Sequence, residues 1–186
     1  DASCMPGEGK ILVKNYPSNE WSELAVNQVL KQKDTIKTDA CSSLVLDFPN
    51  GSTLSVTPGT ELSIEELIWN ESAKKVSINM PSGELRTIIK KVNAPSEFNI
   101  KTPTAICGAT GTIFYVRVTP TGTSVYIGEG SINVVNPFTG EIFTITAGTM
   151  ATFNADGSVN GPAPATDDDI IGWTACYTDM VVEPFV

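Results

Sequence analysis

The sequence predicts an all-β fold, a sandwich or roll of short antiparallel strands with a short helix and a terminal strand near the carboxyl end. Three observations support this. Apolar and polar residues alternate over most of the chain, strand-like runs recur about every ten residues between Gly, Pro and Asn turns, and only 18% of residues are charged. A chain of 186 residues can bury the core of one such domain without help.

The alternation begins near Lys10 and predicts strands that each bury one face. The segment "PSGE" (81–84) is expected to be a turn between two of them. The expected apolar strand positions fall within residues 44–48, 54–56, 62–64, 76–80, 85–89, 98–100, 114–118, 125–127, 132–134, 142–145 and 151–153.

Segment 21–32 fits a helix and an extended chain about equally, and the strand-like "KDTIKT" that follows favours the extended form. Residues 154–166 are rich in Gly, Pro, Ala and Asp and are expected to form a linker or covering loop. We therefore divide the chain into a β-domain with an amino-terminal strand, residues 1–153, and a second part, residues 154–186. That part holds the linker, a short helix and a strand-like tail, packed on the same domain or on a neighbouring subunit.

The helix is predicted from Thr166, which can cap it, with Asp169 three residues later as in a capping box and Gly172 keeping it short. The tail "MVVEPFV" is strand-like, and Pro184 would place it at a sheet edge. If the tail inserts into a neighbouring subunit, its assembly contacts are Val181, Val182 and Phe185.

Composition argues against several functions. A net charge of −9 and a pI near 4.4 make nucleic acid an improbable partner. The absence of histidine removes Ser-His-Asp and Cys-His catalysis and the common catalytic zinc sites. We expect no enzyme, no cofactor and no metal. Acidic and aromatic groups set aside as sites are Glu65-Glu66, Glu129 and Glu141 for a glycosidase, Asp167 to Asp169 for calcium, and Trp21, Trp69 and Trp173 for sugar stacking.

Four cysteines without a CxxC pair predict two disulfides formed in an oxidising compartment, with free buried thiols as the alternative. Three pairings are open, and we favour Cys4 with Cys176 and Cys41 with Cys107. The start at Asp1 and the lack of an apolar run that could cross a bilayer lead us to expect a secreted, mature chain outside the cell or on its surface. Asn50 and Asn70 fit glycosylation acceptors.

The stretch "TPTAICGATGT" (102–112) interrupts the strands with a proline and two glycines. Pro103 offers no ladder donor, so the preceding strand ends there or lies at an edge. Gly108 and Gly111 permit positive φ and close backbone approach, and Thr112 restarts a β-branched strand. We interpret these four residues as a structural turn that closes the core, with a binding loop as the alternative.

Four stretches follow one another along the chain: "VLDFPNGSTLSVTPGTELSIEEL" (45–67), "SGELRTIIKKV" (82–92), "FNIKTPTAICGATGTIFYVRV" (98–118) and "VYIGEGSINVVNPFTGEIFTITAGT" (125–149). Together they resemble the FecR-type extracytoplasmic domain family, over about residues 10–151. The usual Val-Arg pair of the third stretch is Ala109-Thr110 here, and Cys107 takes the place of a small apolar residue.

This resemblance implies FecR-like hairpins and a role outside the cytoplasm. We expect a non-catalytic structural subunit that assembles with copies of itself, as a homo-oligomer or filament, through its terminal strand and sheet edges. The alternative is a monomeric binding or sensor module for a polysaccharide, the cell wall or a partner protein.

Overall fold

The computed structural model describes residues 9–91 and 96–174, and it confirms the all-β class with one short helix. No helix in these two ranges is long and apolar enough to cross a membrane. The elements are β1 (Ile11–Lys14), β2 (Ser22–Glu23), β3 (Thr35–Thr38), β4 (Leu44–Asp47), β5 (Thr53–Val56), β6 (Glu61–Trp69), β7 (Lys74–Ile88), β8 (Ser96–Lys101), β9 (Ile106–Ala109), β10 (Ile113–Thr119), β11 (Gly122–Glu129), β12 (Ser131–Val135), β13 (Ile142–Thr146), β14 (Thr149–Asn154), β15 (Val159–Pro164) and α1 (Asp167–Thr174).

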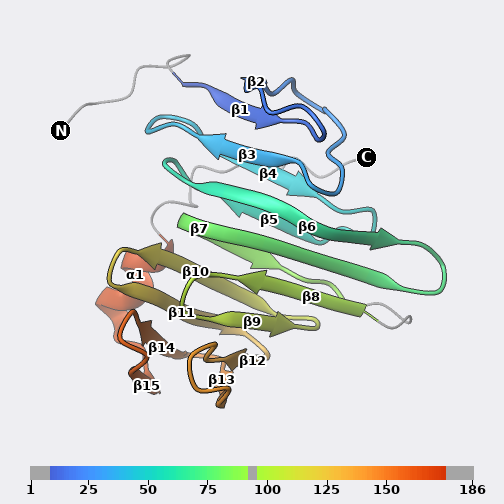
Figure 1. Cartoon of the computed structure of the whole chain (residues 1–186). Coiled ribbons are helices and arrows are strands. Elements are labelled where there is room, and N and C mark those ends of the chain that lie inside the picture. The colour runs from blue at the N-terminus through green and yellow to red at the C-terminus, as the bar shows by residue number, and fades with distance from the viewer. Residues whose placement is uncertain (1–8, 92–95, 175–186) are drawn as a thin grey trace.

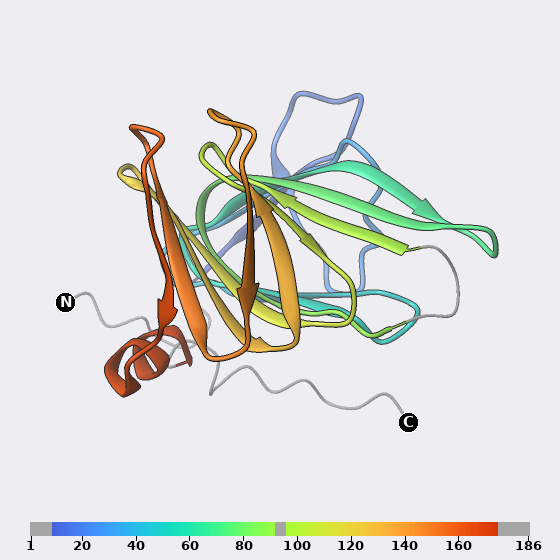
Figure 2. The same ribbon diagram turned by 90° about the horizontal axis from the view of Figure 1, so that it is seen from below.

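The strands form two layers that share β7 (Figure 1). Sheet A has the order β2-β1-β3-β6-β7-β8-β9-β12-β13, and sheet B has the order β4-β5-β7-β10-β11-β14-β15. Figure 2 shows the two layers edge-on, with α1 outside the sandwich. Among the described strands, all pairs are antiparallel, as predicted, except β7 with β8, which run parallel.

β7 runs through the segment that we expected to be a turn. Its first half pairs with β6 in sheet A, and Gly83 to Ile88 pairs with β10 in sheet B. Gly83 has a φ of 105°, and a Cβ there would lie 2.2 Å from the Thr60 hydroxyl. The turn residues therefore mark where one strand passes from one sheet to the other. They do not mark a reversal of the chain.

The core lies between the sheets and consists of the alternating apolar residues of both inner faces. Apolar burial of this kind is the main stabilising contribution in such a sandwich. Phe48 packs edge-on against Phe98, and Phe143 packs edge-on against Phe153. The largest fully buried side chains are Phe114, Phe153, Ile36, Leu54, Leu62, Ile78, Met80, Leu85, Ile100, Ile127, Ile145 and Val13.

Three predictions about single segments can be compared with the structure: segment 21–32, the start of the helix and the linker. Segment 21–32 is not helical, and β3 follows it as expected. The Thr166 hydroxyl accepts a hydrogen bond from the Asp169 amide at 3.2 Å, and Asp169 accepts one from the Thr166 amide at 2.9 Å, so α1 starts with the predicted capping box. The expected linker is wrong in part, because β15 pairs with β14 inside it.

Candidate interaction surfaces

Asp34 holds the segment between β1 and β3 in shape. Its buried carboxylate accepts hydrogen bonds from the Tyr16 amide at 2.9 Å, the Asn15 side chain at 3.1 Å and the Lys31 amide at 2.9 Å. The Gln28 side chain joins the tip to this network through Asn15 at 3.3 Å. A buried carboxylate with several donors fixes a loop strongly, because each lost partner would leave a buried polar group unsatisfied.

This ordered loop presents apolar side chains to solvent. Val26 is 91% exposed and Val29 is 80% exposed, close to a turn in which Asn27 has a φ of 61°. Tyr16 and Trp21 are also exposed. Exposed apolar side chains on a well-bonded loop are typical of a contact surface, since a disordered loop would not fix their positions.

Lysines surround these apolar groups. The Lys14 ammonium lies 4.8 Å from the Trp21 ring centroid, and the Lys33 ammonium lies 4.5 Å from that of Tyr16. In the described ranges, Lys14, Lys31 and Lys33 form no salt bridge with a carboxylate. We call this surface the basic end, and it consists of Lys14, Tyr16, Trp21, Val26, Val29, Lys31 and Lys33.

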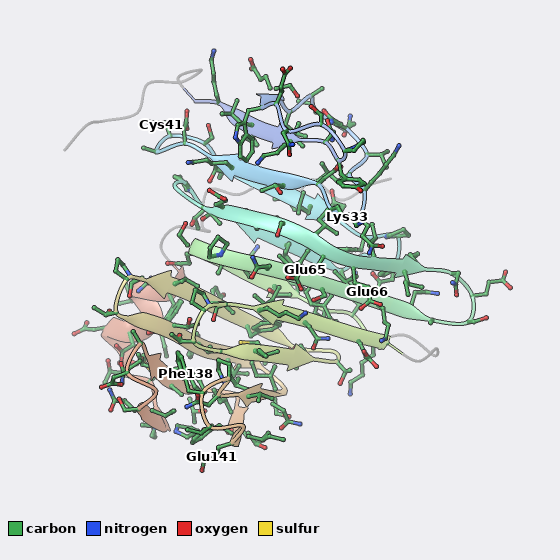
Figure 3. The ribbon with its side chains drawn as sticks, in the orientation of Figure 1. Lys33, Cys41, Glu65, Glu66, Phe138 and Glu141 are labelled. Carbon is green, nitrogen blue, oxygen red and sulfur yellow. The ribbon has the colours of Figure 1, made fainter. Side chains whose placement is uncertain are left out.

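The opposite end of the sandwich is apolar and acidic. The turn after β12 contacts the turn after β14. The Asn136 side chain donates a hydrogen bond to the Gly157 carbonyl at 2.9 Å, and Phe138 packs over Gly157. Phe138 is 57% exposed. Figure 3 shows Phe138 and Glu141 at the end of the molecule remote from Lys33. We call this surface the acidic end, and it consists of Phe138, Glu141, Ile142 and Asp156.

Asp156 is charged at neutral pH. The Ser158 hydroxyl donates to its carboxylate at 2.6 Å and the Ser158 amide donates at 2.9 Å, and both bonds lower the pKa of Asp156 below its ordinary value. Asp156 therefore keeps its negative charge throughout the physiological range.

The outer face of sheet A lies between these ends and carries a row of small polar residues. Strand register aligns Ser77, Asn99, Gly108, Asn133 and Thr144 across β7, β8, β9, β12 and β13. The Thr144 hydroxyl donates to Asn133 at 2.9 Å. Ser77 is buried and Gly108 has no side chain, so Asn99, Asn133 and Thr144 are the side chains of this row that can bond to a polar partner.

Glu65 and Glu66 flank this row. Adjacent residues of a regular strand face opposite sides, but β6 has a register shift between Ile64 and Glu66, so Glu65 and Glu66 both lie on this side. Glu65 accepts from Lys101 at 2.6 Å, while Glu97 and then Glu66 raise the pKa of Lys75 on the same face. Opposite charges therefore alternate on this face.

Sheet B is covered by α1 over part of its outer face. The Trp173 ring stacks on Tyr126 at 6.3 Å and contacts Tyr115 at 6.2 Å. The Arg117 guanidinium lies 4.3 Å from the Trp173 ring centroid, pairs with Glu84 and donates to the Gly172 carbonyl at 3.1 Å. α1 is thus attached by one aromatic cluster and one arginine.

The stretch predicted to form one structural turn forms two turns, one before β9 and one after it. Thr102 and Thr104 each bond the Thr123 hydroxyl at 2.7 Å, which joins the turn containing Pro103 to sheet B. Gly111 has the expected positive φ of 70°.

Gly108 lies inside β9, where Asn99 covers it, so the expectation of a positive φ is wrong there. Buried Thr112 accepts a backbone hydrogen bond from Ile89 at 2.9 Å. The stretch from Thr102 to Thr112 therefore joins the layers.

The disulfide prediction is wrong for Cys107, which is a buried free thiol in β9. Cys41 is disulfide-bonded. The preferred Cys4–Cys176 pair and the tail contacts Val181, Val182 and Phe185 fall outside the described residues.

A small cavity lined by Trp69, Lys74, Lys90 and Phe98 has a volume of about 20 Å³, room for one water molecule. The described residues contain no group of three or more acidic, Cys or His side chains placed to hold a metal. Sheet faces and ends thus offer far more contact area than this cavity.

The sequence did not point to Val26, Val29 or Phe138 as surface residues, because apolar residues in loops give no periodic pattern, nor to Asp34 as the buried carboxylate that fixes the loop. One signal was present. Residues 118–174 contain no Lys or Arg and six Asp or Glu, whereas residues 10–37 contain five lysines and three acidic residues. This asymmetry indicates two ends of different charge.

Solved structures share this architecture. Two crystal structures of a candidate anti-sigma factor from Parabacteroides distasonis ATCC 8503 superpose with TM-scores of 0.60 and 0.61 at 14% identity. The matches cover 75% of this chain and 63% of those chains, so it spans less than two thirds of their length. At this identity, the likeness shows the fold.

No curated protein matches the sequence. The model of the FecR protein family matches residues 34–133, which is more than half of the 186 residues. The match runs from the last residue before β3 into β12 and includes the strand β7 that joins the two sheets. The chain therefore belongs to the FecR protein family.

Proposed function

We propose that this chain is a non-catalytic regulatory module, working outside the cytoplasm, which binds a partner protein through the outer face of sheet A. The observation that carries the proposal is membership of the FecR family, and the structural likeness to proteins named as candidate anti-sigma factors supports it. A module of this kind acts through surface contact, because it changes the state of a partner and breaks no bond.

The polar row supports a protein partner over a polysaccharide. Ser77, Asn99, Gly108, Asn133 and Thr144 carry no aromatic ring on which a sugar could stack. Small amide and hydroxyl groups can pair with the backbone and polar side chains of a protein. The alternating charges of Glu65, Lys75 and Lys101 beside the row add electrostatic selectivity.

The test compares a deletion strain and strains carrying point variants of this gene in its source organism, with transcription as the measurement. Deletion should alter transcription of a defined gene set, and Asn133→Arg should alter the same set, because a large cation in the row blocks the partner. Asn160→Arg, on exposed β15, is the matched control and should behave as wild type. Unchanged transcription on deletion would contradict the regulatory role. Wild-type transcription with Asn133→Arg would contradict the proposal that the partner binds this face.

A self-assembling subunit is the second candidate. The observation that favours it is the gathering of exposed apolar side chains at both ends of the sandwich. Sedimentation of the pure chain distinguishes a self-assembling subunit from a monomeric module.

A further inference from the structure

The exposed apolar side chains are not spread evenly over the surface. Eight large ones stand out in the described ranges, and six belong to the two ends: Tyr16, Trp21, Val26 and Val29 at the basic end, and Phe138 and Ile142 at the acidic end. Ile68 and Ile171 are the other two. Apolar groups concentrated in two patches with polar rims are typical of protein contacts.

The two ends are also complementary in charge. The basic end offers Lys14, Lys31 and Lys33 without carboxylate partners in the described ranges, although Glu20 and Glu23 lie on the same segment. The acidic end offers Glu141 and Asp156, and residues 118–174 contain no Lys or Arg to offset them. The acidic end of another copy would attract the basic end and steer the encounter.

The ends lie at opposite extremes of the sandwich, as Figures 1 and 3 show. At the acidic end, β13 is the edge strand of sheet A, and among the described strands it has a ladder only with β12. Strand β2, with two residues, forms the other edge. The two contact surfaces are different and point apart, so a contact between them is heterologous and leaves one free end on each side of a dimer.

From these observations, we propose that the basic end of one copy of this chain binds the acidic end of the next, giving open, head-to-tail oligomers. Val26 and Val29 pack near Phe138 and Ile142, and lysines of the basic end approach Glu141 and Asp156. The proposal is independent of the regulatory role, because the polar row on sheet A lies outside both contact surfaces. Assembly would place many such faces side by side.

Sedimentation velocity of the full 186-residue chain tests the proposal, from about 1 to about 500 µM and at about 0.05 and 0.5 M NaCl. We expect mass to rise with concentration beyond the dimer, and association to weaken at high salt. Val26→Asp with Val29→Asp should weaken association about tenfold or more, as should Phe138→Asp. Ile68→Asp, an exposed apolar site outside both ends, is the matched control and should associate as wild type.

Mixing provides the decisive measurement. The variant altered at the basic end and the variant altered at the acidic end should each remain monomeric alone and form a 1:1 dimer together, since one intact surface of each kind remains. Circular dichroism confirms that each variant is folded. A monomer at all concentrations, salt-independent association, or a dimer that loses affinity with only one of the two variants would overturn the proposal.

Discussion

Cys107 is a buried thiol whose ionisation opposes folding. Complete burial in β9 raises the pKa of this thiol from 9.0 to about 12. The folded state therefore holds the neutral form, and its stabilising contribution is intact below pH 9 and is lost as pH rises from 9 toward 12. Relative to Cys107→Ala, wild type should lose about 1 kcal/mol more between pH 7.5 and pH 10.

Urea denaturation of both proteins at the two pH values measures this loss. The alanine variant is less stable at every pH because of its cavity, so the informative quantity is the difference in slope. Parallel pH profiles would show that Cys107 does not ionise on unfolding in this range.

Gly83 is constrained by its neighbour as well as by its own backbone. A Cβ would lie 2.5 Å from the Thr60 Cα, whereas Gly59, with a positive φ of 71°, has no atom within 4 Å of such a Cβ. Gly59→Ala should cost about 1 kcal/mol, from backbone strain alone. Gly83→Ala should cost about 3 kcal/mol or more, because the strand must also move from Thr60. Chemical denaturation compares them, and equal costs would contradict the steric argument.

The three tryptophans show what residue-level prediction can and cannot reach. The sequence set them aside as a sugar-stacking platform because they lie far apart in the chain. It could not tell that Trp69 packs on Phe48, that Trp173 stacks on Tyr126, and that Trp21 stays partly exposed beside Lys14. Each outcome depends on a partner far away in the sequence, which local patterns do not encode.

At the scale of elements, α1 is held to sheet B mainly through Trp173 and Arg117. Trp173→Ala removes both the aromatic stacking and the cation–π contact, so α1 should detach while sheet B stays folded. We expect the amides of residues 170–174 to exchange with solvent about tenfold faster or more, with β10 and β11 unchanged. Ile171→Ala, at a residue that is 63% exposed, is the control and should exchange as wild type.

Hydrogen exchange with mass spectrometry reads this directly. Unchanged protection of α1 in the Trp173 variant would mean that the Arg117 bond to the Gly172 carbonyl and the capping box are sufficient. Loss of protection in β10 and β11 as well would show that α1 is part of the sheet B folding unit.

Strand periodicity predicted most elements correctly, and the exceptions have a common cause. β15 contains Gly161, Pro162 and Pro164, which indicate a loop, yet β14 offers an open edge on which it pairs. The parallel pairing of β8 with β7 was also missed, because the chain returns to sheet A after passing through sheet B. The presence of a free partner strand decided both cases.

At the scale of the whole molecule, charge segregation was readable from the sequence, since Arg117 is the last basic residue. The sequence did not show that this segregation gives the folded molecule two differently charged ends. That result requires the chain to run steadily from one end of the sandwich to the other. The strand order shows this progression, with β1 to β3 at one edge of sheet A and β12 and β13 at the other. Sequence asymmetry thus became an end-to-end polarity only through topology.

One strand, β7, joins the two sheets into a single core. Met80 lies at its crossing and is fully buried. Met80→Ala should cost about 2–4 kcal/mol. Because β7 pairs with β6 and β8 on one side and with β5 and β10 on the other, both sheets should lose this amount equally. Met150→Ala, in β14 beneath α1, is the control and should weaken protection mainly around α1.

Native-state hydrogen exchange in increasing denaturant measures the opening free energy of each strand. Amides of β8 and β12 in sheet A should converge with those of β10 and β11 in sheet B on one global value, in wild type and in Met80→Ala. If instead the variant lowered the values of sheet A and left sheet B protected, β7 would be a hinge between two independently stable layers. Head-to-tail contacts through sheet A would then leave sheet B free to open, whereas a single cooperative unit would couple both layers to the same contacts.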